Sequence, residues 1–286
     1  MGENPISRVS SAKSIIVFTD LDGTLLDHDT YRWEEAIPAL SLCKRLSVPI
    51  ILVSSKTRAE MEPLRRELSI SAPFVSENGG GIFFPRETYE DPPPGALPYG
   101  NLWKWSMGVP YPQIVGILQE IRAELGWNIR GFSDMSIEEI SMLTGLDPET
   151  SRLAAMREYD EPFVIVDKPP PSINALLKAA AQRGLTVTTG GRFYHLHGKS
   201  DKGRATEKLL SWYRQSHGKV VSVALGDSPN DLAMLERVDH PFLVGSSRDF
   251  TMLKKRHRLK ITREKGPKGW NEAMLDFLRK NEEGNA

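Results

Sequence analysis

The chain has 286 residues, and its 37 Lys and Arg residues balance 37 Asp and Glu residues, so the formal net charge is zero. A dedicated nucleic-acid-binding protein usually carries a basic excess or stripe, and none dominates here. Cys43 is the single cysteine, so a disulfide framework is excluded. No apolar stretch reaches the roughly 18 residues of a membrane span, and residues 1–14 lack the apolar core of a signal peptide. We therefore expect a soluble, cytoplasmic protein without nucleic-acid or membrane partners.

The first part of the chain alternates apolar strands with helical patterns. Continuous apolar runs at 15–18, 48–53 and 74–75 predict buried strands. Apolar residues at helical spacing over 33–46 predict a helix, and a second helix begins at Thr57, which forms a capping box with Glu60 three residues later. This order of strands and helices is typical of a doubly wound parallel sheet.

The character of the sequence changes at Pro85, where a proline-rich segment follows over 91–95. Beyond it lies a mixed block of helical and strand patterns, with a hairpin signal at Gly190-Gly191. The predicted elements of this block lie at 114–125, 136–139, 163–166, 172–183, 185–189 and 192–197, and a further helix begins at Asp147-Pro148. We interpret the block as a small α+β domain of its own.

The first pattern returns in the last third of the chain, with a strand at 220–225 and a closing helix at 270–278. The predicted fold class is therefore α/β, with a Rossmann-like doubly wound parallel sheet in a discontinuous core domain and an inserted α/β cap domain. The predicted boundaries are a flexible N-terminal arm at 1–14, a core at 15–84 and 199–286, and an insert at 85–198.

Polar side chains follow three of the predicted core strands at the point where each strand ends. They are Asp20, Asp22 and Thr24 after the first strand, Ser54 and Lys56 after the second, and Asp227, Asn230 and Asp231 after the strand at 220–225. Ligands of open α/β sheets bind outside the carboxyl ends of the strands, so we expect these groups to converge. Lys202, between the insert and the second half of the core, adds a cation.

Several carboxylates at one sheet edge repel one another unless a cation compensates them. Mg²⁺ prefers an octahedral oxygen shell that includes one or two carboxylates and a substrate phosphate oxygen. We predict that the side chains of Asp20 and Asp227 and the backbone carbonyl of Asp22 bind Mg²⁺, and that Asp231 acts through water.

Each of these motifs also has a structural interpretation. Ser54 could cap the helix that begins near Thr57, Lys202 could be a surface lysine, and the 227–231 segment could be only a capped helix start.

The order of the motifs resembles the haloacid dehalogenase-like (HAD) phosphatases. Asp20-Leu21-Asp22-Gly23-Thr24 is similar to the first motif of that family, and Ser54, Lys202 and Gly226–Asp231 follow in the order of the other three. The resemblance implies that Asp20 attacks phosphorus and forms an aspartyl-phosphate, and that Asp22 works as general acid and base. It also implies that Ser54 and Lys202 offset charge on the phosphoryl group, and that the insert is a Cof-type (C2B) cap.

Further stretches resemble one subfamily, the mannosyl-3-phosphoglycerate phosphatases. They are Val53–Glu60, Glu77–Gly80, Leu143–Leu146, Gly190–Leu196, Asp201–Ala205 and Gly266–Trp270. The resemblance implies removal of phosphate from mannosyl-3-phosphoglycerate to leave mannosylglycerate, a compatible solute. The carboxylate of such a substrate needs an Arg fork or N–H donors. The substrate-binding candidates are Thr24, Lys56, Glu77, Asn78, Thr144, Gly145, Arg152, Arg157, Gly191, Arg192 and Asn230. Apart from Thr24 and Asn230, each of them could equally have a structural role.

Three alternatives stay open. One is another sugar phosphatase, acting on glucosyl-3-phosphoglycerate or on a sucrose- or trehalose-phosphate. The second is a phosphomannomutase, which would return the phosphoryl group to sugar rather than to water. The third is a phospho-ligand-binding module without turnover, although binding alone would not require both Asp20 and Asp22. The choice between mannosyl and glucosyl substrates and the oligomeric state are open as well.

Overall fold

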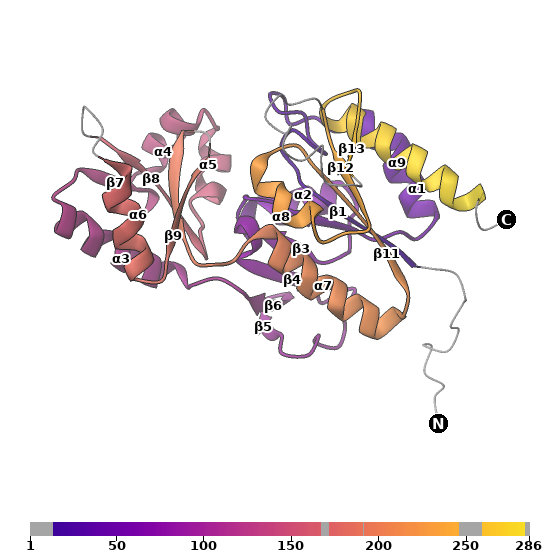
Figure 1. The fold of residues 1–286 in the computed structure, drawn as a ribbon, viewed down its shortest axis with the longest axis horizontal. Coiled ribbons are helices and arrows are strands. Elements are labelled where there is room, and N and C mark those ends of the chain that lie inside the picture. Colours follow the sequence, from indigo (N-terminus) through magenta and orange to yellow (C-terminus); the bar gives the residue numbers. More distant parts are fainter. Residues whose placement is uncertain (1–13, 167–171, 191, 246–258, 284–286) are drawn as a thin grey trace. The chain divides into compact units, whose positions relative to one another are not determined.

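The computed structural model describes residues 14–166, 172–190, 192–245 and 259–283 (Figure 1). The predicted N-terminal arm, except Ser14, and the candidate Gly191 lie outside the described residues. The chain forms two compact units, one made of Met1–Leu52 with Thr206–Ala286 and the other of Val53–Ala205. Among the described residues, no helix is both long and apolar enough to cross a membrane.

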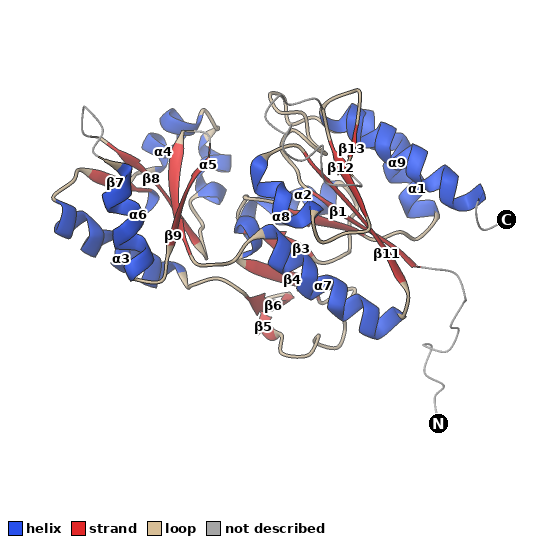
Figure 2. Ribbon diagram, viewed as in Figure 1, coloured by secondary structure: helices blue, strands red, loops and turns tan. Residues whose placement is uncertain are grey.

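The first unit is built on parallel strands in the order β13-β12-β11-β1-β2. Their bounds are β1 Ser14–Thr19, β2 Ile50–Val53, β11 Val220–Gly226, β12 His240–Leu243 and β13 Lys260–Ile261. Figure 2 shows helices on both faces of these strands, which is why β1, β2 and β11 are almost entirely apolar and buried. The parallel sheet predicted for the core is confirmed.

Four helices accompany this sheet: α1 Ile37–Arg45, α7 Lys202–His217, α8 Leu232–Leu235 and α9 Gly266–Glu283. The α1 and α9 helices pack against each other on one face (Figure 1). The indole Nε1 of Trp270 in α9 donates to Thr19 Oγ1 at 2.9 Å, and both side chains are fully buried. Thr19 Oγ1 in turn contacts the backbone oxygen of Asp20 at 2.8 Å. The closing helix is thereby fixed to the end of β1, where the first motif begins.

The second unit contains two antiparallel arrays of strands. One array has the order β3-β4-β6-β5 and the other β7-β8-β10-β9. The bounds are β3 Phe74–Ser76, β4 Gly81–Pro85, β5 Leu97–Tyr99, β6 Leu102–Ser106, β7 Ile129–Gly131, β8 Asp160–Ile165, β9 Thr186–Gly190 and β10 Phe193–His197. The hairpin of β9 and β10 confirms the signal seen around Gly190.

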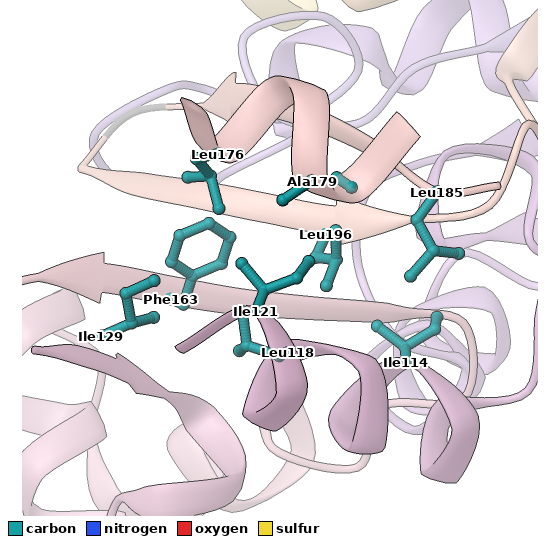
Figure 3. Close-up of a cluster of buried hydrophobic side chains, with 10 residues drawn as sticks. Ile114, Leu118, Ile121, Ile129, Phe163, Leu176, Ala179, Leu185 and Leu196 are labelled. Carbon is teal, nitrogen blue, oxygen red and sulfur yellow. The ribbon is translucent and has the colours of Figure 1, made fainter. Parts of the chain in front are cut away.

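The helices of this unit are α2 Arg58–Glu67, α3 Tyr111–Leu125, α4 Ile137–Thr144, α5 Pro148–Ala154 and α6 Ile173–Gln182. The α3 and α6 helices pack with the β7-β8-β10-β9 array around one apolar core (Figure 3). Phe163 of β8 and Leu196 of β10 meet Leu118 and Ile121 of α3 and Leu176 of α6 there. This core accounts for an α+β block within the predicted insert, whose boundaries at 85 and 198 stay a prediction.

The hairpin of β5 and β6 has no counterpart in the sequence analysis. Pro98 lies in β5, and proline is confined to edge strands because it cannot donate to the ladder. The strand β5 is only three residues long, which is too short for its sequence to show an alternation of apolar and polar residues. Because β6 pairs with β4, the hairpin at 97–106 adds two strands to the array that contains β3 and β4.

Candidate active site

Three carboxylates come together at the carboxyl ends of β1 and β11. One side-chain oxygen from each of Asp20, Asp227 and Asp231 lies within 4.8 Å of the other two. The strands β1 and β11 pair in parallel from Ser14↔Val220 to Thr19↔Leu225, and the Asp20 N–H donates to Leu225 O at 2.9 Å. The register therefore carries Asp20 and Asp227 to the same edge. Three carboxylate oxygens so close together form a donor set of the kind that hard divalent cations prefer.

A tight turn after β1 lets Asp227 approach. Gly23 has φ +78°, and a Cβ atom there would overlap the Asp227 carboxylate. Thr24 is fully buried, and its hydroxyl donates to Asp227 Oδ1 at 3.3 Å. Asp22, in the same turn, forms a bridge with Leu26. Thr24 thus orients a carboxylate of the cluster, which is an alternative to the substrate contact predicted for it.

Asp231 braces the loop that carries Asp227. Its Oδ2 atom accepts from the backbone N–H groups of Asp227 and Ser228 and from the Ser228 hydroxyl, each at 3.0 Å. Ser228 and Asp231 form a capping box at a 3-10 helix over Pro229–Asp231 that leads into α8. The capped helix start is therefore present, and it also carries the acidic cluster. Asn230, a predicted substrate contact, is exposed and accepts from the Ser228 hydroxyl.

In the second unit, Ser54 follows β2 directly and is 1% exposed. Its N–H donates to Val75 O at 3.0 Å, and its Oγ accepts from the Lys56 N–H at 3.2 Å. The cap of α2 is Thr57, which forms the predicted capping box with Glu60. Capping of α2 therefore does not explain Ser54.

Lys202 is the first residue of α7 and is only 1% exposed. The interpretation of Lys202 as an ordinary surface lysine is thereby excluded. A buried ammonium is costly unless negative groups compensate it. The position of Lys202 thus fits a lysine that balances negative charge.

The predicted cap residues fall into separate groups. Thr144 and Gly145 form the end of α4, where the Thr144 hydroxyl donates to Ile140 O at 2.7 Å and Gly145 has φ +80°. The Arg192 Nη1 donates to Leu143 O at 3.1 Å, which brings Arg192 to the same loop. Arg152 is an exposed residue of α5, which packs against α4.

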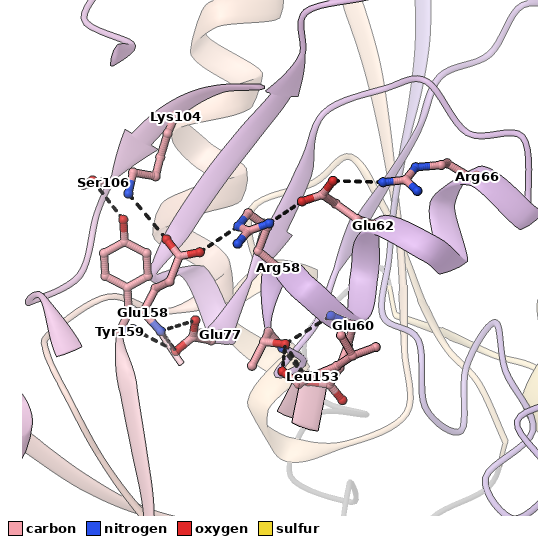
Figure 4. A network of polar contacts seen from close by, with 11 residues as sticks. Arg58, Glu60, Glu62, Arg66, Glu77, Lys104, Ser106, Leu153, Glu158 and Tyr159 are labelled. Carbon is pink, nitrogen blue, oxygen red and sulfur yellow. Dashed lines mark hydrogen bonds and ion pairs between the residues drawn. The ribbon is translucent and has the colours of Figure 1, made fainter. Parts of the chain in front are cut away.

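Glu77 and Arg157, by contrast, lie in a buried polar network of the second unit. Both oxygens of Glu77 accept from backbone N–H groups of residues 158 and 159 (Figure 4). Burial raises the pKa of Glu77 to about 7, although Arg157 opposes this shift. Burial also acts on Asp160, but His195 and Arg157 hold the pKa of that carboxyl below its ordinary value. The Asp160 Oδ2 lies 2.8 Å from His195 Nδ1 and 3.4 Å from Arg157 Nη1.

Sequence reasoning missed Glu158 and Tyr159, whose backbone binds Glu77, and the ion pairs around them. Glu158 pairs with Arg58 at 2.8 Å and with Lys104 at 3.4 Å (Figure 4). These partners lie 100 and 54 residues away along the chain. No local periodicity or motif links residues at such separations, so the sequence of this one chain holds no signal for them.

The fold and the acidic cluster define a hydrolase of the HAD type, and the chain belongs to the haloacid dehalogenase-like hydrolase family, which matches residues 17–91 and 166–265. The unmatched stretch between the two segments lies inside the predicted insert. Among more particular relatives, a protein of Methanococcoides burtonii named glucosyl-3-phosphoglycerate/mannosyl-3-phosphoglycerate phosphatase is 43% identical over 272 residues, which are 93% of this chain and 98% of the relative. The mannosyl-3-phosphoglycerate phosphatase of Pyrococcus furiosus is 36% identical over 233 residues, or 82% and 92% of the two chains.

A solved structure supports the same fold. BT1666 of Bacteroides thetaiotaomicron, described as a phosphatase of the HAD superfamily, has a TM-score of 0.63 with 16% identity and covers 96% of this chain and 98% of its own. At this identity the likeness concerns the fold alone. The predicted α/β class and both resemblances, to the HAD phosphatases and to the mannosyl-3-phosphoglycerate phosphatases, are confirmed.

Proposed function

We propose that the chain is a magnesium-dependent phosphatase that hydrolyses mannosyl-3-phosphoglycerate to mannosylglycerate and phosphate, and that glucosyl-3-phosphoglycerate is a second substrate. The observation that carries the proposal is the cluster of Asp20, Asp227 and Asp231 at the ends of adjacent parallel strands. The name of the 43% identical relative, which covers both esters, favours the second substrate.

The acidic cluster fits Mg²⁺ through its carboxylate oxygens. Asp20 and Asp227 would bind the ion through their side chains, Asp22 through its backbone carbonyl and Asp231 through water. When bound, Mg²⁺ neutralises negative charge on the phosphoryl oxygens and orients them.

The proposed reaction has two steps, both carried by residues of this chain. A carboxylate oxygen of Asp20 attacks phosphorus, the ester P–O bond breaks, and Asp22 gives its proton to the leaving alkoxide. Asp22 then takes a proton from water, whose oxygen attacks the aspartyl-phosphate and releases phosphate with the Asp20 carboxylate restored. Such proton transfers by a positioned side chain are typically worth about 10²–10⁴-fold in rate.

The remaining roles concern charge and recognition. We assign Ser54 and Lys202 to the phosphoryl oxygens, and Lys56, Asn78 and Asn230 to groups next to them. The loop around Thr144 and Gly145, with Arg152, Gly191 and Arg192, is assigned to the sugar and the glycerate carboxylate. The hydrogen bond from Arg192 to the carbonyl of Leu143, the residue before Thr144, supports placing these residues in one binding group. The cytoplasmic location predicted from the sequence stays part of the proposal.

The test is a screen of phosphate esters for release of inorganic phosphate, with Mg²⁺ and after chelation with EDTA. We expect release from mannosyl- and glucosyl-3-phosphoglycerate with Mg²⁺, and none after chelation. Conversion of mannose 6-phosphate to an isomer without phosphate release would favour the mutase. Binding of the esters without any turnover would favour a ligand-binding module, and either result would contradict the proposal.

A further inference from the structure

Three consecutive residues after β3 have left-handed backbone. The φ angles are +47° for Glu77, +51° for Asn78 and +98° for Gly79. Residues other than glycine rarely adopt this conformation, and they keep it only where the surrounding structure holds them. Two such residues in succession therefore indicate that contacts with the surrounding structure fix the conformation of this turn.

Backbone N–H groups of this turn donate hydrogen bonds to the loop that carries Ser54. The Glu77 N–H donates to Lys56 O at 3.0 Å, and the Asn78 N–H donates to Ser54 O at 2.9 Å. The remaining carbonyl of the loop, Ser55 O, accepts from Arg157 Nη1 at 3.1 Å. All three successive carbonyls from Ser54 to Lys56 are thus fixed by this group of residues.

The side chain of Glu77 holds the turn from behind. It is 3% exposed, and its Oε1 accepts from the Glu158 N–H at 2.9 Å while its Oε2 accepts from the Tyr159 N–H at 2.8 Å (Figure 4). The backbone also holds Arg157, whose Nε donates to Ala154 O at 2.8 Å. Both oxygens of Glu77 are therefore engaged by backbone donors, which argues against direct contact with a substrate.

The same turn also meets the residue before Lys202. A Cβ atom on Gly79 would overlap the backbone carbonyl group of Asp201, with 2.6 Å to its carbon, so only glycine fits. The turn therefore lies between two backbone segments, one that carries Ser54 and one that carries Lys202.

We infer that Glu77 is a positioning residue for the phosphoryl-binding groups: it locks the 77–79 turn, which fixes the backbone of the Ser54–Lys56 loop. Arg157 has the same role at the Ser55 carbonyl. The inference rests on the proposed function, in which Ser54 contacts the phosphoryl group. It replaces the substrate contact predicted for Glu77 and Arg157 with an action through the loop.

The test compares Glu77→Gln with Glu161→Gln. Glu161 is a matched control, because it is fully buried in the same unit and accepts from Tyr111 Oη at 2.6 Å and the Ser133 N–H at 3.0 Å, without touching the loop. Two readouts are taken for each protein. One is kcat/KM for mannosyl-3-phosphoglycerate with Mg²⁺, and the other is amide hydrogen exchange over residues 54–57 and 76–79.

For Glu77→Gln we expect a fall of about 10- to 100-fold in kcat/KM, as for a small misplacement of catalytic groups, together with faster exchange of these amides. Glu161→Gln leaves both unchanged. Arg157→Lys, which keeps the charge but loses the fork, gives the same pattern as Glu77→Gln and serves if that variant does not fold.

Each result decides the inference. Equal kcat/KM for the two Gln variants overturns it, and so does a fall in kcat/KM without faster exchange, since Glu77 would then act by touching substrate. If the native protein releases no phosphate from any ester, the proposed function fails. Exchange alone then decides whether Glu77 holds the loop: faster exchange in Glu77→Gln supports this, and unchanged exchange overturns it.

Discussion

At the scale of the residue, the geometry of the acidic cluster depends on the absence of a side chain at Gly23. This glycine has φ +78° and leaves room for the Asp227 carboxylate. The left-handed backbone alone costs a non-glycine residue about 1–2 kcal/mol. The overlap adds to that penalty and moves one of the three carboxylates.

Gly23→Ala is therefore expected to lower the free energy of unfolding by at least about 1–2 kcal/mol and to weaken binding of Mg²⁺. Chemical denaturation and a magnesium titration measure the two effects. Gly116→Ala is the control, because Gly116 lies in α3 with no heavy atom within 4 Å of an added Cβ. A Gly23→Ala protein with native stability and native magnesium affinity would contradict this account.

Glu77 predicts a dependence of stability on pH. Its pKa is raised from 4.5 to about 7 by burial, among Arg157, Asp160 and the amides of residues 158 and 159. Between these values the folded protein keeps a proton that the unfolded chain loses, so this group contributes stability that is lost as the pH rises from 4.5 to 7. The loss amounts to about 3 kcal/mol.

Unfolding free energies of the native protein and Glu77→Gln, measured across this pH range, check the prediction. The native protein should lose stability with rising pH relative to the variant. Parallel curves for the two proteins would show that Glu77 ionises at its ordinary pKa.

At the scale of the element, Trp270 ties α9 to β1 through the hydroxyl of Thr19, which also contacts the Asp20 carbonyl. Trp270→Phe removes the indole donor and leaves a small cavity, so it should cost about 2 kcal/mol of stability. It should also lower kcat, because Asp20 follows Thr19. Urea unfolding and phosphate-release kinetics measure the two effects.

Trp105→Phe is the matched control. Trp105 is 5% exposed, and its Nε1 donates to Pro94 O at 3.1 Å. This variant should lose comparable stability and keep its kcat. If both variants lose kcat equally, the coupling of α9 to Asp20 is wrong.

The elements also show how far a sequence alone can predict structure. Features that depend on a few neighbouring residues are predicted correctly. They are the end of β1, the Thr57–Glu60 capping box and the 227–231 turn. The β5 strand and the partners of Glu77 are missed, since the former has no apolar alternation and the latter depend on contacts across 81 and 82 residues. Local patterns thus predict strand ends, caps and turns better than the long-range contacts that hold them in place.

At the scale of the whole molecule, the unfolding equilibrium should report on the metal. Three carboxylates at one edge destabilise the metal-free protein through repulsion, and a ligand that binds only the folded state stabilises it. At a magnesium concentration of 100 times the Kd, the gain should be about 2.7 kcal/mol.

Asp227→Asn keeps the oxygen that accepts from Thr24 but removes one charge of the cluster. We expect this variant to be at least as stable as the native protein without magnesium, and to gain almost nothing when magnesium is added. Thermal unfolding with and without Mg²⁺ measures this. An undiminished gain in Asp227→Asn would place the magnesium site elsewhere.

Trapping of the covalent intermediate tests the central claim most directly. The native protein is mixed with mannosyl-3-phosphoglycerate and Mg²⁺, quenched with acid within milliseconds, and its peptides are weighed by mass spectrometry. We predict one added phosphoryl group on the peptide that contains Asp20, and none in Asp20→Asn. Turnover by the native protein with no phosphoryl group on Asp20, or with the group on another residue, would contradict the account.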